Sequence, residues 1–109
     1  MAEWVPECGD IVWLEFDPQA GREQAGHRPA VVLSPASYNT KSGLIVCCPT
    51  TTRIKGYPFE GPLQGQPASV VLSDQVRSLD WRARRAKMKG KVTGGELEAV
   101  RDKVRLLVG

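Results

Sequence analysis

The sequence predicts a mainly β fold, a small barrel of short strands followed by one C-terminal α-helix. A length of 109 residues is enough for one domain with a modest core, so residues 1–109 are expected to form a single unit. Eleven glycines and eight prolines imply many turns, which suit short strands better than a helical bundle. Near the end of the chain the apolar spacing becomes that of a helix.

Apolar runs bounded by turn residues define the expected strands. Trp13 is expected to anchor the first strand as a large apolar residue, and residues 44–50 are nearly all apolar, as in a central strand. A loop of about ten residues over 18–27 is longer than most hairpin connections, which suggests a functional role. Pro35 should end the second strand, with a turn or one helical turn over 37–43. In order, strands are expected at 10–17, 28–34, 44–50, 59–63, 68–72, 76–79 and 91–92.

The last part of the chain predicts an amphipathic helix. Thr93 and Glu96 have the T-x-x-E spacing of a capping box, which marks a helix N-terminus. We expect the helix to dock one stripe on the barrel, because apolar residues then recur at helical spacing, at Leu97, Val100, Val104 and Leu107.

The cysteines and the charge distribution restrict the class of protein. Cys8, Cys47 and Cys48 provide neither a disulfide framework nor a metal-binding spacing, and the adjacent pair should point to opposite faces of one strand. No stretch resembles a signal peptide or reaches membrane-spanning length, so we expect a cytoplasmic protein without a membrane contact. The net charge is only +3, but six basic residues and no acid lie between Arg82 and Lys91. This run is either a solvated face or a surface for a polyanion or an acidic partner.

The segment from Gly21 to Pro35, GREQAGHRPAVVLSP, holds the strongest chemical signal. It carries Glu23, the chain's only histidine, His27, and Arg28 to the start of a buried strand. Arginine offers a planar fork for phosphate oxygens, and histidine and glutamate can move protons near neutral pH. Pro29 favours an extended conformation at Arg28. The segment therefore suits chemistry on a phosphate, although Arg28 could instead form an ion pair and His27 could be a structural hydrogen-bonding group.

Metal-assisted cleavage is not expected, because one histidine and no paired acids at ligand spacing give no metal-ligand cluster. No other cofactor is expected either. Cleaving a phosphodiester without a metal requires a base for the attacking hydroxyl, stabilisation of the charge that develops at phosphorus, and a proton for the leaving oxygen.

Four segments in order resemble the MazF/PemK family of toxin endoribonucleases, from Val5 to the last residue: GDIVWLEFDP, GREQAGHRPAVVLSP, CPTTTRIKGYPFE and LSDQVRSLDWRAR. The resemblance implies an SH3-like barrel of the MazF/PemK (CcdB-like) type. It also implies a type II toxin that cuts single-stranded mRNA at selected sequences without a metal, through attack of the 2′-OH. The products would end in a 2′,3′-cyclic phosphate and a 5′-OH.

The same resemblance suggests the site residues. Arg28 and Thr51 would act on the scissile phosphate, with Glu23 or His27 as proton carriers. Polar residues near strand ends, and one aromatic residue that could stack a base, would hold the RNA: Glu15, Phe16, Asn39, Lys55, Gln75, Arg77 and Ser78. Phe16, Tyr38 and Trp81 could instead belong to the core of so small a barrel.

The resemblance also implies partners: a two-fold homodimer whose interface groove takes RNA, and an acidic, partly disordered MazE-like antitoxin. Two alternatives of other classes remain at this stage. One is a non-catalytic toxin like the CcdB gyrase poisons, and the other is an SH3-like RNA-binding or adaptor module without catalysis.

Overall fold

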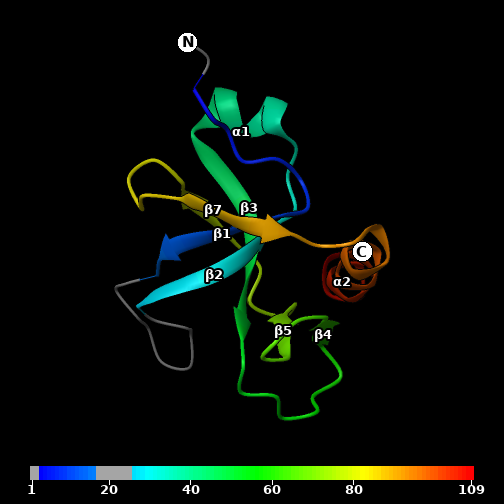
Figure 1. Cartoon of the computed structure of the whole chain (residues 1–109). Helices are drawn as coiled ribbons and strands as arrows, with labels where there is room; N and C mark the ends of the chain where they lie inside the picture. Colours follow the sequence, from blue (N-terminus) through cyan, green and yellow to red (C-terminus); the bar gives the residue numbers. More distant parts are fainter. Residues whose placement is uncertain (1–2, 17–25) are drawn as a thin grey trace.

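The computed structural model describes residues 3–16 and 26–109, and the fold is mainly β, as predicted (Figure 1). In chain order the elements are β1 (Asp10–Glu15), β2 (His27–Val32), α1 (Ala36–Ser42), β3 (Leu44–Thr51), β4 (Glu60–Leu63), β5 (Ser69–Leu72), β6 (Arg77–Asp80), β7 (Lys87–Lys91) and α2 (Gly94–Val108).

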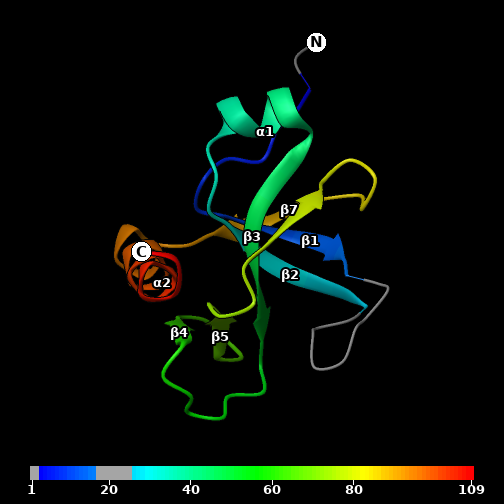
Figure 2. The same cartoon turned by 180° about the vertical axis from the view of Figure 1, so that it is seen from behind.

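β3 is the centre of a curled antiparallel sheet in the order β4-β5-β3-β2-β1-β7. Residues 44–47 of β3 pair with β6, and residues 50–51 pair with β5. Because β3 changes partner along one edge, its two ends belong to different parts of the sheet. Figures 1 and 2 show α1 at one end of β3, and β4 and β5 at the other.

Strand alternation divides the apolar residues between two core clusters. Cys47 belongs to the cluster formed by β1, β2, β3 and β6, whereas Cys48 belongs to the one between β2, β3, β4, β5 and α2. The predicted opposite orientation of these neighbours is therefore confirmed, and both thiols are fully buried.

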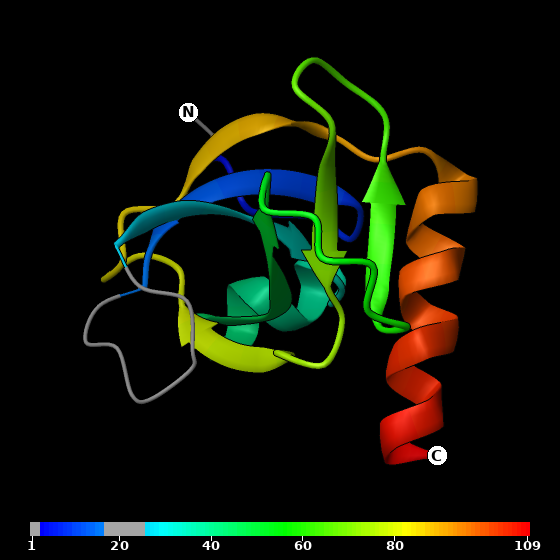
Figure 3. The same cartoon turned by 90° about the horizontal axis from the view of Figure 1, so that it is seen from below.

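α2 packs along β4, as Figure 3 shows. Its capping box is confirmed: the Thr93 hydroxyl accepts from the Glu96 N–H, and the Glu96 carboxylate accepts from the Thr93 N–H. Val100 is buried, but the predicted stripe does not extend to Leu107, which is 49% exposed. Figure 3 shows that the last turns of α2 extend beyond the end of β4. None of the described helices is long and apolar enough to cross a membrane.

Two predictions about the strands were wrong. The last strand was expected at 91–92, but β7 covers residues 87–91 and so lies inside the basic run. Its position depends on antiparallel pairing with β1 and not on apolar content. Trp13, expected to anchor the first strand, lies outside the first core cluster: Val12 and Leu14 belong to that cluster, and the side chain of Trp13 lies half-buried on the other face of β1. The expected helical turn over 37–43 is the seven-residue helix α1.

Candidate active site

The register between β2 and β3 brings the two main candidates together. Ala30 pairs with Pro49, Val31 with Cys48 and Val32 with Cys47. Continuing this antiparallel register by two residues places Arg28 opposite Thr51, on the same face of the sheet. The continuation is supported by a hydrogen bond of 3.3 Å from the Thr50 hydroxyl to the Pro29 carbonyl oxygen.

Thr51 is the last residue of β3, not the first residue beyond it, and it is only 9% exposed. Its Oγ1 accepts a hydrogen bond of 3.1 Å from the Arg53 N–H. The hydroxyl therefore retains its own proton for donation, to a phosphate oxygen for example.

Two hollows meet at Thr51. The first, which we call the Thr51 cleft, has a volume of about 300 Å³ and is lined by Thr51, Arg53, Lys55, Tyr57, Glu60, Leu72, Asp74 and Gln75. The second, which we call the Trp13 groove, has a volume of about 390 Å³. Its described lining is Ile11, Trp13, His27, Arg28, Pro29, Thr50, Thr51, Thr52, Leu63, Gln64, Gly65, Gln66, Pro67, Ser69 and Lys89. The predicted catalytic pair thus lies where a ligand could reach both hollows.

A buried carboxylate shapes the wall of the Thr51 cleft. Glu60 is 8% exposed, and its two oxygens accept separate backbone hydrogen bonds, from Lys55 at 3.0 Å and from Gly56 at 2.8 Å. The Lys55 ammonium lies 5.7 Å from the centre of the Tyr57 ring. Glu60 therefore fixes the backbone that presents the predicted RNA-binding Lys55 beside Thr51.

His27 lies at the start of β2 and is exposed. Its ring stacks on that of Trp13, with centroids 5.3 Å apart and planes at 13°. The Lys89 ammonium lies 5.6 Å from the centre of the Trp13 ring. The stack therefore holds the exposed His27 ring in a fixed position at the start of β2.

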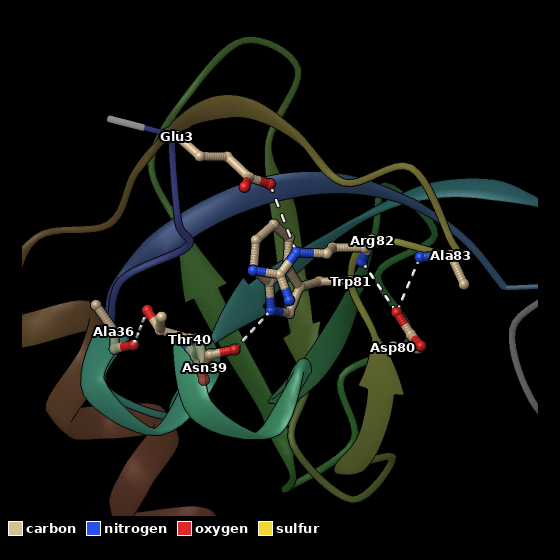
Figure 4. Close-up of polar contacts among 8 residues, drawn as sticks. All are labelled: Glu3, Ala36, Asn39, Thr40, Asp80, Trp81, Arg82 and Ala83. Atoms are coloured by element: carbon tan, nitrogen blue, oxygen red, sulfur yellow. Dashed lines mark hydrogen bonds and ion pairs between the residues drawn. The ribbon is translucent and has the colours of Figure 1, made fainter. Parts of the chain in front are cut away.

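The prediction that Asn39 binds RNA is wrong, because Asn39 is fully buried in α1. Its side-chain amide donates to the carbonyls of Pro6 and Ser34, and its amide oxygen accepts from the Ser34 hydroxyl. Its backbone carbonyl accepts the indole N–H of Trp81 at 2.9 Å, as Figure 4 shows. Asn39 therefore joins the N-terminal segment, β2, α1 and the end of β6 into one structural network.

Figure 4 also shows how the connection after β6 is held. The Asp80 carboxylate accepts the backbone N–H groups of Arg82 and Ala83, and the Arg82 guanidinium contacts Glu3 at 3.5 Å. The Arg82 guanidinium also lies 4.2 Å from the centre of the Trp81 ring. Since Trp81 is only 3% exposed, it is a core residue and not a stacking surface.

Phe16 is also a core residue, with no exposed surface, so its predicted role in stacking a base is wrong. The guanidinium of Arg77 lies 5.8 Å from the centre of the Phe16 ring, at the start of β6. Ser78 follows on β6 and is exposed, as is Glu15 at the end of β1. Arg77, Ser78 and Glu15 do not line either hollow, whereas Gln75 lines the Thr51 cleft with Lys55.

Glu23 lies outside the described residues, so its predicted role stays a prediction. The basic run is not one uniform face. Arg84 donates to the Glu15 carbonyl at 2.8 Å, and Lys91 forms an ion pair of 2.6 Å with the buried Asp10. The hydrogen bond to Asp10 raises the pKa of Lys91. Of the run's members, Lys89 lines the Trp13 groove.

Burial raises the pKa of both Cys47 and Cys48 to about 12, so neither thiol supplies a thiolate nucleophile near neutral pH. Within residues 3–16 and 26–109, no group of three or more His, Cys, Asp and Glu side chains could hold a metal ion.

Sequence reasoning gave no site role to Trp13 or Glu60, and it considered Lys89 only as a member of the basic run. The alternation of Val12 and Leu14 with Ile11 and Trp13 was a signal that Trp13 faces away from the first core cluster. For Glu60 there was no sequence signal, because two backbone N–H groups satisfy it and no charged partner is involved.

The chain was compared with known proteins. Residues 7–108 match the family described as PemK-like, MazF-like toxins of type II toxin–antitoxin systems. The endoribonuclease toxin MazF of Escherichia coli strain K12 is 53% identical over 110 residues, covering 100% of this chain and 99% of the relative. A crystal structure of MazF from Deinococcus radiodurans matches with a TM-score of 0.93 at 51% identity, over 98% of this chain and 99% of that one. A MazE–MazF complex from the same organism matches with a TM-score of 0.87 at 51% identity, over 98% of each chain.

Proposed function

The chain belongs to the family of PemK-like, MazF-like toxins of type II toxin–antitoxin systems, and from this premise we propose how it cuts RNA. It is a MazF-like endoribonuclease toxin, and its partner is a MazE-like antitoxin. The proposal concerns the residues that carry the reaction and the course of the cleavage. The observation that supports it is the β2–β3 register: continued by two residues, it brings Arg28, on the wall of the Trp13 groove, opposite Thr51, which lines both hollows.

In the proposed reaction, a metal ion is not required and the RNA supplies its own nucleophile. A base takes the proton of the 2′-OH, the 2′-oxygen forms a bond to phosphorus, and the bond from phosphorus to the 5′-oxygen breaks. The leaving oxygen takes a proton, so the products are a 2′,3′-cyclic phosphate and a free 5′-OH. Glu23 or His27 handles a proton in this scheme.

Arg28 acts as the electrostatic clamp. A guanidinium stays charged and binds two phosphate oxygens through its planar fork, so it stabilises the negative charge of the phosphorane. Thr51 donates its hydroxyl proton to a phosphate oxygen, and the Arg53 N–H that bonds its Oγ1 orients it. Lys55 and Gln75, across the Thr51 cleft, hold the adjoining nucleotides.

The substitution series for this mechanism uses Arg28 and Thr51. Arg28→Ala should lose about 3–4 kcal/mol of transition-state stabilisation, the scale of removing one preorganised group. Arg28→Lys should recover little of this loss, since a lysine lacks the planar fork. Thr51→Ala should be severe and Thr51→Ser milder, because serine keeps the hydroxyl.

The decisive assay uses one long single-stranded RNA with EDTA present, and a matched RNA with 2′-deoxyribose at the mapped cut site. The deoxy substrate should bind without being cut. Cleavage of the deoxy substrate, or full activity of Arg28→Ala, would overturn the mechanism, whereas loss of cleavage on adding EDTA would overturn its metal independence.

We propose further that residues 1–109 act as one domain in the cytoplasm and form a homodimer. The dimer would provide more concave surface for single-stranded mRNA than so small a chain offers alone. The antitoxin would be acidic and partly disordered. It would cover the basic surface and block the RNA groove at the dimer interface. Sedimentation that shows only a monomer at micromolar concentration would count against the dimer.

A further inference from the structure

The Trp13 groove contains an aromatic stack that the proposed cleavage chemistry does not use. The rings of Trp13 and His27 are nearly parallel, 5.3 Å apart, and the Lys89 ammonium lies 5.6 Å from the centre of the Trp13 ring. All three residues line the groove. They come from three neighbouring strands, β1, β2 and β7, so the sheet itself holds them in place.

This stack is not needed to fill the core. On β1, Val12 and Leu14 are fully buried in the first core cluster, whereas Trp13 points to the opposite face and is only half-buried. The stack ends in the exposed His27 ring at the wall of a hollow, so it offers a flat ring that a ligand can reach.

The charge of the groove favours an anionic ligand. Its described lining includes Arg28 and Lys89 and contains no aspartate or glutamate. Gln64 and Gln66, which carry amide side chains, also line it at the turn between β4 and β5. Amides can bond the edges of bases, ammonium groups bind phosphates, and aromatic rings stack on bases of any sequence.

We propose that the Trp13 groove binds the part of the RNA strand that flanks the cut, with one nucleobase extending the Trp13–His27 stack and Lys89 contacting a phosphate. The inference rests on the proposed function, because Arg28 and Thr51 lie on the wall of this groove and Thr51 also lines the Thr51 cleft. An RNA strand held at Thr51 can therefore continue from the cleft into the groove without leaving the surface.

An acidic peptide segment of an antitoxin is the competing occupant, since it too would suit a basic groove. The parallel stack favours RNA, because every nucleobase offers a π-face of matching shape, whereas an acidic side chain gains nothing from the two rings. The two occupants are separated by experiment.

The experiment measures binding of an uncleavable probe, a single-stranded RNA with 2′-deoxyribose at its mapped cut site. Two shorter probes are trimmed from the 5′ and the 3′ end towards the cut. Trp13→Leu should raise the Kd for the long probe about ten-fold, the scale of losing one stacked base. For the probe trimmed on the side that enters the groove, the variant and the wild type should bind equally.

Trp4→Leu is the matched control, because Trp4 is also a partly exposed tryptophan, 39% exposed, but lies against Trp81 outside the groove. It should leave every Kd unchanged. Lys89→Ala should reduce the slope of log Kd against log salt by about 0.7, the contribution of one phosphate on a single strand. If Trp13→Leu fails to fold, two other variants keep the test decisive. Trp13→Phe should bind the long probe almost normally, and Lys89→Ala should show the reduced salt slope.

Three results would overturn the proposal: unchanged binding of the long probe by Trp13→Leu, an equal loss for all three probes, or intact RNA binding with weakened antitoxin binding. The last would assign the groove to the peptide. Because the probe is never cut, these results are independent of the cleavage mechanism, which fails separately if the wild type leaves the all-ribose RNA intact.

Discussion

Glu60→Gln tests how the wall of the Thr51 cleft is built. Each carboxylate oxygen of Glu60 accepts one backbone hydrogen bond, at 3.0 Å from Lys55 and at 2.8 Å from Gly56. Glutamine has the same shape, but one of its two terminal atoms is an NH₂ donor that would face a backbone donor. The variant must therefore lose one hydrogen bond to a charged group at a site that is only 8% exposed.

The loss should reduce the free energy of unfolding by about 1.5–3 kcal/mol, the range for a hydrogen bond to a charged group. For a chain of this size, each kcal/mol corresponds to a fall of about 4–8 °C in the melting temperature. Since the loosened segment carries Lys55, the KM for RNA should rise several-fold while kcat changes little, because Arg28 and Thr51 stay in place.

Glu7→Gln is the matched control. A single oxygen of Glu7, Oε1, accepts both the Cys8 N–H at 2.8 Å and the Ala36 N–H at 3.0 Å. A glutamine carbonyl can keep both bonds, so this variant should lose much less stability than Glu60→Gln and should leave the KM unchanged.

The assays are urea unfolding at one fixed protein concentration and initial rates of RNA cleavage. A fixed concentration is needed because dimerisation would make the measured stability concentration-dependent. Equal stability of Glu60→Gln and the wild type would refute the assignment of the two hydrogen bonds. Equal losses in the Glu60 and Glu7 variants would refute the argument from oxygen geometry.

Three further predictions concern packing, capping and thiol reactivity. Gly61→Ala would place a Cβ 2.9 Å from Val100 Cγ2 and should cost about 1–3 kcal/mol in urea unfolding, so an unchanged midpoint would contradict the close packing of α2 on β4. Thr93→Ala should cost about 1 kcal/mol through loss of the N-cap oxygen, with cleavage at low temperature preserved. A thiol reagent at pH 8 should label one cysteine per native chain and spare Cys47 and Cys48, because burial raises the pKa of both thiols to about 12. Rapid labelling of all three cysteines would contradict that burial.

The fold could be predicted because its local signals agree with one another. Alternating apolar residues predict the strands, turn residues predict the connections, and the Thr93 capping box predicts the start of the last helix. The structure contains each of these kinds of element. β7 was misplaced because it is an edge strand whose exposed residues 87–89 are polar or flexible, so its position depends on pairing with β1 and not on its own apolar content.

The candidate site was less predictable, because side-chain direction depends on tertiary pairing. Polarity near a strand end suggested an RNA contact at Asn39, but the amide is buried in a network of hydrogen bonds. Aromatic character left Phe16 either a stacking or a core residue and suggested Trp13 as an anchor of the first strand, whereas Phe16 is buried in the core and Trp13 lines a hollow. One residue of displacement in β1 decides which aromatic ring faces a hollow.

The same dependence on register connects the Asn39 network to the candidate site. The Ser34 hydroxyl donates to Asn39 Oδ1 at 2.6 Å and accepts the Val46 N–H at 2.9 Å, so the network fixes β3 against the chain that follows β2. A slip of one residue between these strands would turn Arg28 and Thr51 to opposite faces of the sheet, because side chains alternate with a period of two. A buried asparagine that never touches the ligand thus helps to determine whether the proposed clamp and the hydroxyl can act on one phosphate.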